Sequence, residues 1–289
     1  MVYAPNPDVF GNDAIDYYVT GGINTSKAAR ISIKILPVND QPSFKLATNL
    51  VVVGEDDGTI ILPNFAYDIV KGTANESKQA VKFIVNVPDE QTLLFAGVKR
   101  TVNKPNPDGA YIGYGLPQIN AKGLLKSTPA KNSYGDVTVT VQMMDSGGTT
   151  NGGINLSEGT TFILIITNVN DAPVIGRIAS ATINKNGSTN FVVNVSDTDN
   201  APESLTLSVA SSNKDLLPDQ NITVSKGESP TQRVVQVIPV ADNNGTTLLT
   251  FTVSDGNGGT ASVSALLRVI SVNDSQSFVL ERMRTSLQK

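Results

Sequence analysis

Alternation of apolar and polar residues is the feature that most constrains this chain. An apolar side chain stands at nearly every second position in six stretches, residues 29–36, 137–144, 160–167, 233–240, 248–254 and 261–269. A period of two is that of a β-strand with one buried face. In the first stretch Ile31, Ile33 and Ile35 share a face. We expect these faces to pack on a second sheet in an all-β fold, without a helix before the C-terminal tail.

Clusters of Gly, Asn, Asp and Pro separate the predicted strands. Two examples are "DSGGTTNGG" at 145–153 and "DGNGG" at 255–259. Residues of these types favour tight turns, and turns between alternating strands indicate antiparallel hairpins. The sequence therefore predicts antiparallel β-sandwiches.

Three residue types that carry much of enzyme chemistry are missing. The chain has no Cys, His or Trp, which excludes disulfides, thiolate metal sites, cysteine nucleophiles and every catalytic triad with histidine. Paired carboxylates could serve a glycosidase, but nothing in the sequence indicates an aromatic-lined cleft around them. We expect a protein that is not an enzyme.

The charge balance indicates which partners suit the chain. A net charge of −4 and a pI near 4.9, without a clustered basic face, argue against nucleic acid. The same balance suits cations with oxygen ligands. No apolar run approaches the roughly 18 residues of a membrane span, and "MVYAPNPDVFG" does not resemble a signal peptide. If the protein is exported, we expect this chain to be part of a longer one.

A short motif recurs at domain-sized intervals. It appears as "PVNDQP" at 37–42, "NVNDAP" at 168–173 and "SVNDSQ" at 271–276, so that Asp40, Asp171 and Asp274 are 131 and 103 residues apart. These intervals predict two complete sandwiches at 41–171 and 172–274. Residues 1–40 are expected to be the closing strands of an incomplete domain, and 275–289 to begin a further one.

The ordered set of motifs resembles a known family. The strings "YAPNPDVFGNDAIDYYVTGG", "VNDAP", "VSDTDN" and "VSDGNGG" are similar to the cadherin-like tandem repeats of large bacterial surface and secreted proteins, and more distantly to cadherin ectodomains. The resemblance implies immunoglobulin- or cadherin-like antiparallel β-sandwiches in an extended array. It also implies an extracellular or cell-surface location and calcium in the joints.

The resemblance also implies which residues bind calcium. Calcium takes six to eight oxygen ligands from carboxylates, Asn side chains and carbonyls. At the middle joint the implied ligands are the linker and loop residues Asn170, Asp171, Asp197, Asp199 and Asp255, with Glu55 from the preceding domain. Four carboxylates gathered without a cation would repel one another, which favours an ion there.

The other joints depart from the pattern. The first has Asn39, Asp40 and Asp145, but only Asp68 where an Asp-x-Asp pair is expected, so these four residues form a weaker candidate site. The last domain reads "INKNGST" at 183–189, where an acidic pair is expected. An alternative holds for every joint, because Asn and Asp before Pro or Gly also form Asx turns that bind no metal.

Two functions remain open at this stage. The first is a non-enzymatic adhesion segment or spacer, stiffened by calcium between neighbouring repeats. Copies could also assemble head to tail into a filament if the strand "SFVL" at 277–280 completed the open N-terminal sheet of the next copy. The second is a carbohydrate-binding accessory module of a secreted enzyme, with Tyr111, Tyr114 and Tyr134 as the sugar platform. A cell-surface protein or glycan is a further possible partner of the adhesion segment.

Overall fold

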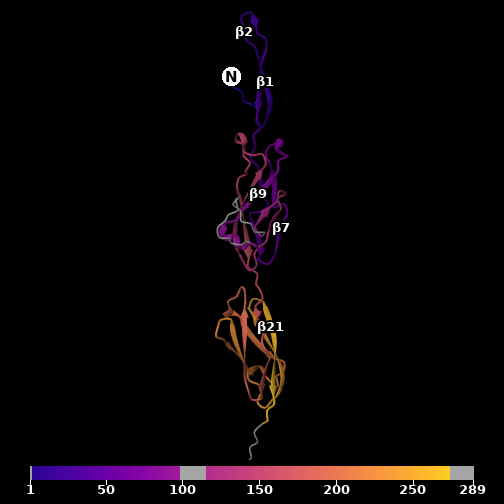
Figure 1. Ribbon diagram of the computed structural model, residues 1–289, viewed down its shortest axis with the longest axis vertical. Helices are drawn as coiled ribbons and strands as arrows, with labels where there is room; N and C mark the ends of the chain where they lie inside the picture. Colours follow the sequence, from indigo (N-terminus) through magenta and orange to yellow (C-terminus); the bar gives the residue numbers. More distant parts are fainter. Residues whose placement is uncertain (1, 98–114, 274–289) are drawn as a thin grey trace, which may run out of the picture. The chain divides into compact units, whose positions relative to one another are not determined.

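The computed structural model describes residues 2–97 and 115–273. Its contacts divide the chain into two compact units, Met1–Val169 and Asn170–Lys289 (Figure 1). Regular structure is almost entirely β, which confirms the predicted fold class. Within the described residues the helical segments are short 3-10 turns: η1 Ala74–Glu76, η2 Asp89–Leu94, η3 Thr150–Gly152, η4 Pro202–Ser204 and η5 Asp219–Asn221. No helix there is long and apolar enough to cross a membrane.

The first unit begins with a hairpin and continues as a sandwich. The hairpin pairs β1 (Gly11–Tyr17) with β4 (Ala29–Ile35), and β2 (Thr20–Gly21) with β3 (Asn24–Thr25) beyond them. The main sheet has the order β6-β13-β12-β9, and the smaller sheets are β10-β11-β7 and β5-β8. Their bounds are β5 Ser43–Leu46, β6 Leu50–Gly54, β7 Ile60–Leu62, β8 Ala66–Val70, β9 Val81–Asn86, β10 Gln118–Ile119, β11 Leu125–Ser127, β12 Gly135–Asp145 and β13 Thr160–Thr167.

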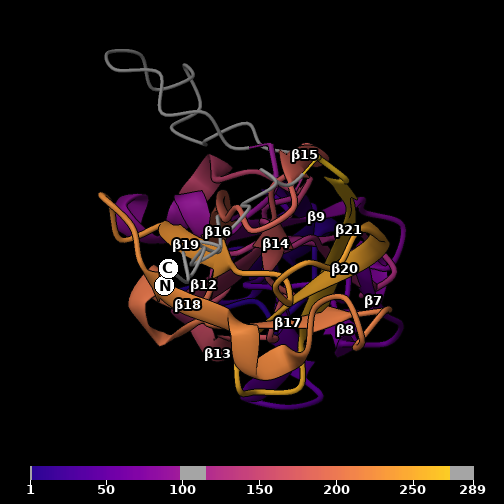
Figure 2. The ribbon, with the colours of Figure 1, turned by 90° about the horizontal axis from the view of Figure 1, so that it is seen from below.

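The second unit is a sandwich of two four-stranded sheets, with the orders β14-β16-β19-β18 and β15-β21-β20-β17. In the end view of Figure 2, β16, β18 and β19 lie to one side of β17, β20 and β21. The bounds are β14 Val174–Ile175, β15 Ala181–Asn184, β16 Thr189–Ser196, β17 Thr206–Ser211, β18 Ile222–Lys226, β19 Gln232–Val237, β20 Gly245–Ser254 and β21 Thr260–Ile270.

Each sandwich encloses its own apolar core, built from the inward positions of the alternating strands. Phe65 and Phe162 make an edge-to-face contact in the first, with ring centroids 4.9 Å apart. Phe191 and Phe251 do the same in the second at 5.6 Å. The inward side chains of a strand are buried because they all lie on one face of the sheet, and that face packs against the opposite sheet.

One glycine has the same position in three hairpins. Gly11 pairs with Ile35, Gly135 with Ile166 and Gly245 with Val269, and each partner lies five residues before the Asp of a Val-Asn-Asp motif. The glycines have φ of 121°, 150° and 144°, which side chains rarely adopt. The hairpins β1–β4, β12–β13 and β20–β21 are therefore three copies of one element.

The first of these hairpins corrects one expectation. Ile31, Ile33 and Ile35 do lie on one face of β4, as the alternation predicts. That face packs on no second sheet within residues 2–97 and 115–273, and no side chain between residues 2 and 38 is buried. Alternation reports which residues share a face, but it does not report whether another sheet is present to cover it.

Candidate metal centre

Three segments bring polar side chains to one end of the second unit. Asn170 and Asp171 precede β14, Asp197 and Asp199 follow β16, and Asp255 begins the turn between β20 and β21. Backbone and side-chain hydrogen bonds connect them. The Asn170 Nδ2 donates to Asp255 Oδ2 at 2.8 Å, and the Asp171 N–H donates to Asp199 Oδ2 at 2.7 Å. The five residues expected together from this unit are therefore linked in the structure.

Asp255 is the most buried of these carboxylates, with 6% of its surface exposed. Its oxygens also accept the N–H groups of Asn257 and Gly259, at 2.7 and 3.0 Å. A Cβ on Gly259 would lie 2.2 Å from Asp255 Oδ2 and 3.0 Å from Ala172 Cα, so a side chain there would displace the carboxylate from its present position. The hydrogen bond from the Asn170 side chain lowers the pKa of the Asp255 carboxyl. Burial of the carboxyl raises this pKa, and the hydrogen bonds from the backbone N–H groups lower it further.

Asp197 organises the loop after β16. Its Oδ1 accepts the N–H groups of Asp199 and Asn200, at 2.8 and 2.9 Å. Its Oδ2 is buried without a hydrogen-bond partner, and so is Asn200 Oδ1. Unpaired buried oxygens are costly, and a cation is one kind of partner that such oxygens accept. Sequence reasoning missed Asn200, although it closes the "VSDTDN" motif.

The donor set fits calcium in chemistry, but its geometry is not that of a formed site. Within the described residues, no three Asp or Glu side chains are grouped to hold a metal ion. No Lys or Arg of the described chain forms a salt bridge with these four aspartates. The segments therefore offer carboxylate, amide and carbonyl oxygens without a compensating charge, which is the chemistry that calcium selects.

Glu55 belongs to the first unit. Its side chain is 2% exposed, its Oε1 accepts the Val169 N–H at 3.1 Å, and its Oε2 has no partner. It thus holds the residue that precedes Asn170 in the chain. Whether Glu55 contributes to a metal site stays a prediction.

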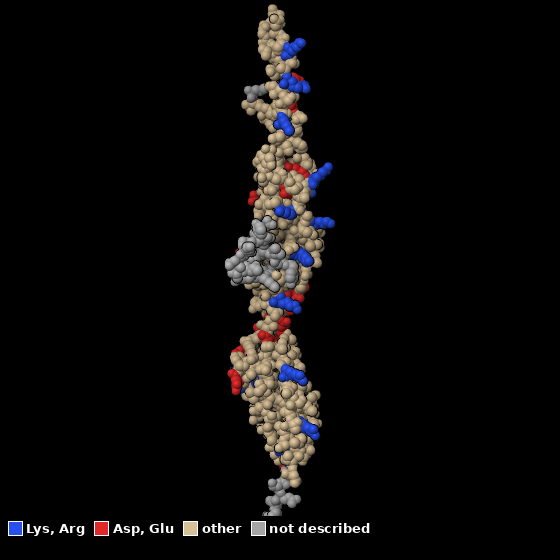
Figure 3. Space-filling view, viewed as in Figure 1, with Lys and Arg blue, Asp and Glu red and all other residues tan. Residues whose placement is uncertain are grey.

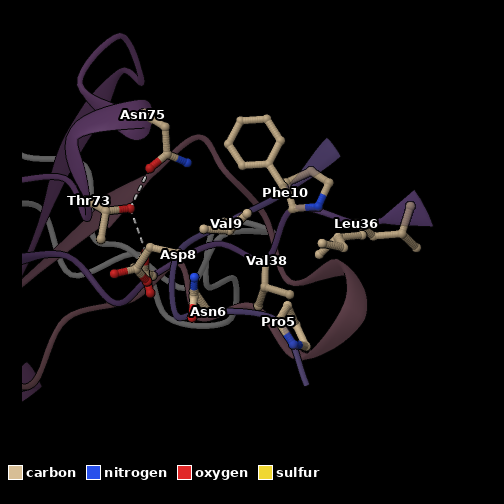
Figure 4. Close-up of a pocket in the computed structure, with 12 residues that line it drawn as sticks. Pro5, Asn6, Asp8, Val9, Phe10, Leu36, Val38, Thr73 and Asn75 are labelled. Atoms are coloured by element: carbon tan, nitrogen blue, oxygen red, sulfur yellow. Dashed lines mark hydrogen bonds between the residues drawn. The ribbon is translucent and has the colours of Figure 1, made fainter. Parts of the chain in front are cut away.

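A second polar cluster lies in the first unit, where β4 leads into the sandwich. Asn39 Nδ2 donates to Asp145 Oδ1 at 3.0 Å and to the Ile154 carbonyl at 2.7 Å. Asp40 Oδ2 accepts the Thr73 hydroxyl at 2.9 Å. The same hydroxyl also lies 2.6 Å from Asn75 Oδ1 (Figure 4). The buried Glu76 carboxylate accepts the Asp40 N–H at 3.3 Å. Of the four residues predicted here, the structure links Asn39 with Asp145 and brings Asp40 to Glu76.

Asp68 is not part of this hydrogen-bonded cluster. It has φ of 49° and forms a surface salt bridge with Lys45 at 2.9 Å. Glu76, in η1, supplies the carboxylate beside Asp40 instead. No motif indicated Glu76, because it follows no Asp-x-Asp pattern and its position depends on the fold of the segment after β8.

Some predicted features lie outside the described residues. These are Tyr111, Tyr114, Asp274 and the strand predicted at 277–280. Tyr134 is described and is 60% exposed. Tyr134 is thus accessible, whereas the two other tyrosines of the predicted sugar platform lie outside the described residues.

The lowered pKa of Asp255 predicts how the stability of the second unit changes at acidic pH. Because the folded pKa is lowered, the unfolded chain binds a proton more readily, and Asp255 stabilises the second unit above its ordinary pKa of about 4. This stabilisation is lost as the pH falls through the folded pKa. We expect Asp255→Asn to flatten the fall in stability of the second unit below about pH 5, measured by denaturant unfolding at several pH values. The exposed Asp215→Asn is the control, and equal curves for Asp255→Asn and wild type would contradict the prediction.

Comparison with known proteins finds one family model that is similar to part of the chain. Residues 170–267 match the family described as "Bacterial Ig domain", which covers the sandwich of the second unit. The match supports an immunoglobulin-like repeat, as the sequence indicates. No curated protein sequence matches significantly.

Solved structures match this chain at low identity and low TM-score. Mouse cadherin-23 EC22-24 is 17% identical, with a TM-score of 0.44, over 90% of this chain and 74% of its own. The PcdhgB3 EC1-4 structure is 12% identical, with a TM-score of 0.46, and the match covers 93% of this chain and 66% of that one. The titin M3 domain is 21% identical, with a TM-score of 0.27, and the match covers 34% of this chain and 95% of that domain.

Proposed function

We propose that this chain is a non-enzymatic extracellular segment of tandem β-sandwiches that serves as a structural spacer, with calcium ordering the joint before the second sandwich. The observation that carries the proposal is the link between Asn170 and Asp171, in the joint, and the loop carboxylates of Asp197, Asp199 and Asp255. The match of residues 170–267 to a bacterial immunoglobulin-like family supports the repeat architecture.

The residues of the joint have separate roles in this proposal. Asp255 holds Asn170, and Asp199 holds the backbone of Asp171, so two loops of the sandwich already fix the joint segment. Asp197 Oδ2 and Asn200 Oδ1 are the oxygens left free to bind an ion. Bound calcium would supply the positive charge that the four aspartates lack. A joint held in this way loses hinge freedom that a free linker of the same length retains.

The test is calcium titration of the whole chain after removal of metal with EDTA, followed by calorimetry. We expect binding in the micromolar to millimolar range. Asp197→Asn should weaken it by at least about tenfold because it neutralises the carboxylate with the unpaired oxygen. Asp219→Asn is the matched control, since Asp219 pairs with Lys214 at the surface of the same unit.

The consequence for stability and stiffness is measured on the same samples. Calcium that binds the folded state raises the melting temperature of the second unit. Small-angle scattering should show a narrower distribution of distances with calcium than with EDTA. No heat of binding in wild type, or equal binding by Asp197→Asn, would leave the Asn-Asp motifs as turns without metal. The spacer proposal would then lose its stiffening device.

A further inference from the structure

Four asparagines in this chain are followed directly by glycine: Asn151, Asn186, Asn244 and Asn257. Such a pair is chemically labile, because glycine has no side chain to shield its backbone nitrogen from the amide of the preceding asparagine. All four pairs lie among the described residues. The structure therefore shows, for each pair, what holds the two groups that react, which are the Asn side-chain amide and the Gly N–H.

The pair at 186–187 is held most firmly. The Asn186 amide donates to Asp242 Oδ1 at 2.9 Å and accepts the Asp242 N–H at 2.8 Å. The Gly187 N–H donates to the Asn184 carbonyl at 3.1 Å. Both reacting groups are engaged, so these hydrogen bonds must open before the two groups can meet.

Two further pairs belong to regular elements. The pair at 244–245 enters β20, where the glycine stands opposite Val269 in the ladder. The pair at 151–152 lies in η3, a turn that the Gly153 N–H closes onto the Thr150 carbonyl at 3.1 Å. The backbone at these two asparagines is therefore restrained by the fold.

Asn257 lacks these restraints. It is exposed in the turn between β20 and β21. Within residues 2–97 and 115–273, neither its side chain nor the Gly258 N–H has a hydrogen-bond partner. The glycines on both sides of it, Gly256 and Gly258, have φ of 82° and 108°, and no atom lies within 4 Å of the place where a Cβ would stand. The two reacting groups can thus approach each other without breaking a hydrogen bond of their own.

We propose that Asn257 is a site of spontaneous deamidation, with water as the co-reactant. The Gly258 nitrogen bonds to the Asn257 Cγ, the Cγ–Nδ2 bond breaks, and ammonia leaves with the proton of the Gly258 N–H. Water then opens the resulting succinimide ring at one of its two carbonyls and gives aspartate or isoaspartate at 257. Either product adds a negative charge, and isoaspartate also adds a methylene group to the backbone.

The modification falls on the turn that holds Asp255. Asp255 Oδ1 accepts the N–H groups of both Asn257 and Gly259, at 2.7 and 3.0 Å. An extra backbone atom between these two donors moves them apart, so that they no longer meet at one oxygen. Asp255 in turn accepts the Asn170 side chain at 2.8 Å. Isoaspartate at 257 is therefore expected to loosen both the turn and the contact of Asp255 with Asn170.

The added charge acts in the same direction when no cation is bound. In Figure 3 acidic side chains gather where the second unit begins, and a carboxylate at 257 stands two residues from Asp255. Like charges so close together repel. An effect on calcium binding rests on the proposed function, whereas the deamidation step and its effect on the turn do not.

The test is incubation of the whole chain in EDTA at neutral pH and physiological temperature, with peptide mass spectrometry at successive times. We expect deamidation at least about tenfold faster at Asn257 than at Asn186, since the hydrogen bonds at Asn186 must open first. Asn257→Gln is the matched variant, because it keeps an amide and the backbone N–H bond to Asp255 but closes a ring much more slowly. It should abolish modification at 257 and leave the rate at 186 unchanged. Modification that appears first at 151, 186 or 244 would overturn the proposal.

The effect on the turn is measured on the same samples, still in EDTA. Isoaspartate is quantified with an isoaspartate-specific methyltransferase, and the melting temperature of the second unit by calorimetry. We expect the melting temperature of wild type to fall as isoaspartate accumulates, while that of Asn257→Gln incubated for the same time stays constant. Isoaspartate at 257 without such a fall would overturn the effect on Asp255. Calcium titration of fresh wild type decides the proposed function separately, because deamidation is measured without metal.

Discussion

Replacing Phe251 by alanine is expected to lower the free energy of unfolding of the second unit by about 3 to 5 kcal/mol. Phe251 lies on β20, is fully buried and meets Phe191 of the opposite sheet edge-to-face. Its removal therefore costs the transfer free energy of the ring and leaves a cavity between the two sheets. A domain of this size has a total stability of about 5 to 15 kcal/mol, so the loss is a large part of it.

The measurement is calorimetric or denaturant unfolding of the whole chain, in which the two units are followed as separate transitions. Leu248→Ala is the matched control because Leu248 is on the same strand but faces solvent, with 45% of its surface exposed. It should change the stability by less than about 0.5 kcal/mol. The transition of the first unit should be unchanged in both variants. A shift of both transitions together would show that the two units do not unfold independently.

The strands were predictable because their signal is local. Residues 160–167 form β13 over that range, and the stretches at 137–144 and 261–269 lie within β12 and β21. The cover of a strand is not a local property. Ile33 and Leu267 stand at equivalent register positions with similar side chains, but only Leu267 has a second sheet opposite it.

The candidate site was predictable to the same degree and for a related reason. Asn170, Asp197 and Asp255 belong to short motifs whose resemblance to the cadherin pattern implied that they converge, and hydrogen bonds connect their segments in the structure. Glu76 could not be predicted in this way. It comes to Asp40 because the segment after β8 turns back through η1, and Gly72 allows the approach, since a Cβ there would lie 1.7 Å from Glu76 Oε2.

Arg233 shows that the two-residue period of a strand holds even for a charged residue. It alternates with Val235 and Val237 on β19, so the period of two puts it on the inward face, and it is buried there. Its Nη1 donates to the carbonyls of Pro230 and Gln232 at 2.8 and 2.9 Å. Its Nη2 donates to the carbonyls of Pro202 and Leu205, on either side of Ser204. One guanidinium thus ties the η4 segment to β19.

We expect Arg233→Leu to destabilise the second unit by about 2 to 4 kcal/mol, because four carbonyls lose a charged donor and some of them stay away from water. Arg233→Lys should be intermediate, since an ammonium group retains the charge but has fewer donors and no planar fork. Gln236→Leu adds the same side chain on the exposed face of β19 and is the control. Buried charges are costly, and a well-packed Leu can equal them. Unchanged stability in Arg233→Leu would therefore mean that desolvation of the guanidinium offsets its four hydrogen bonds, and that the arginine fixes the η4 segment without stabilising the sandwich.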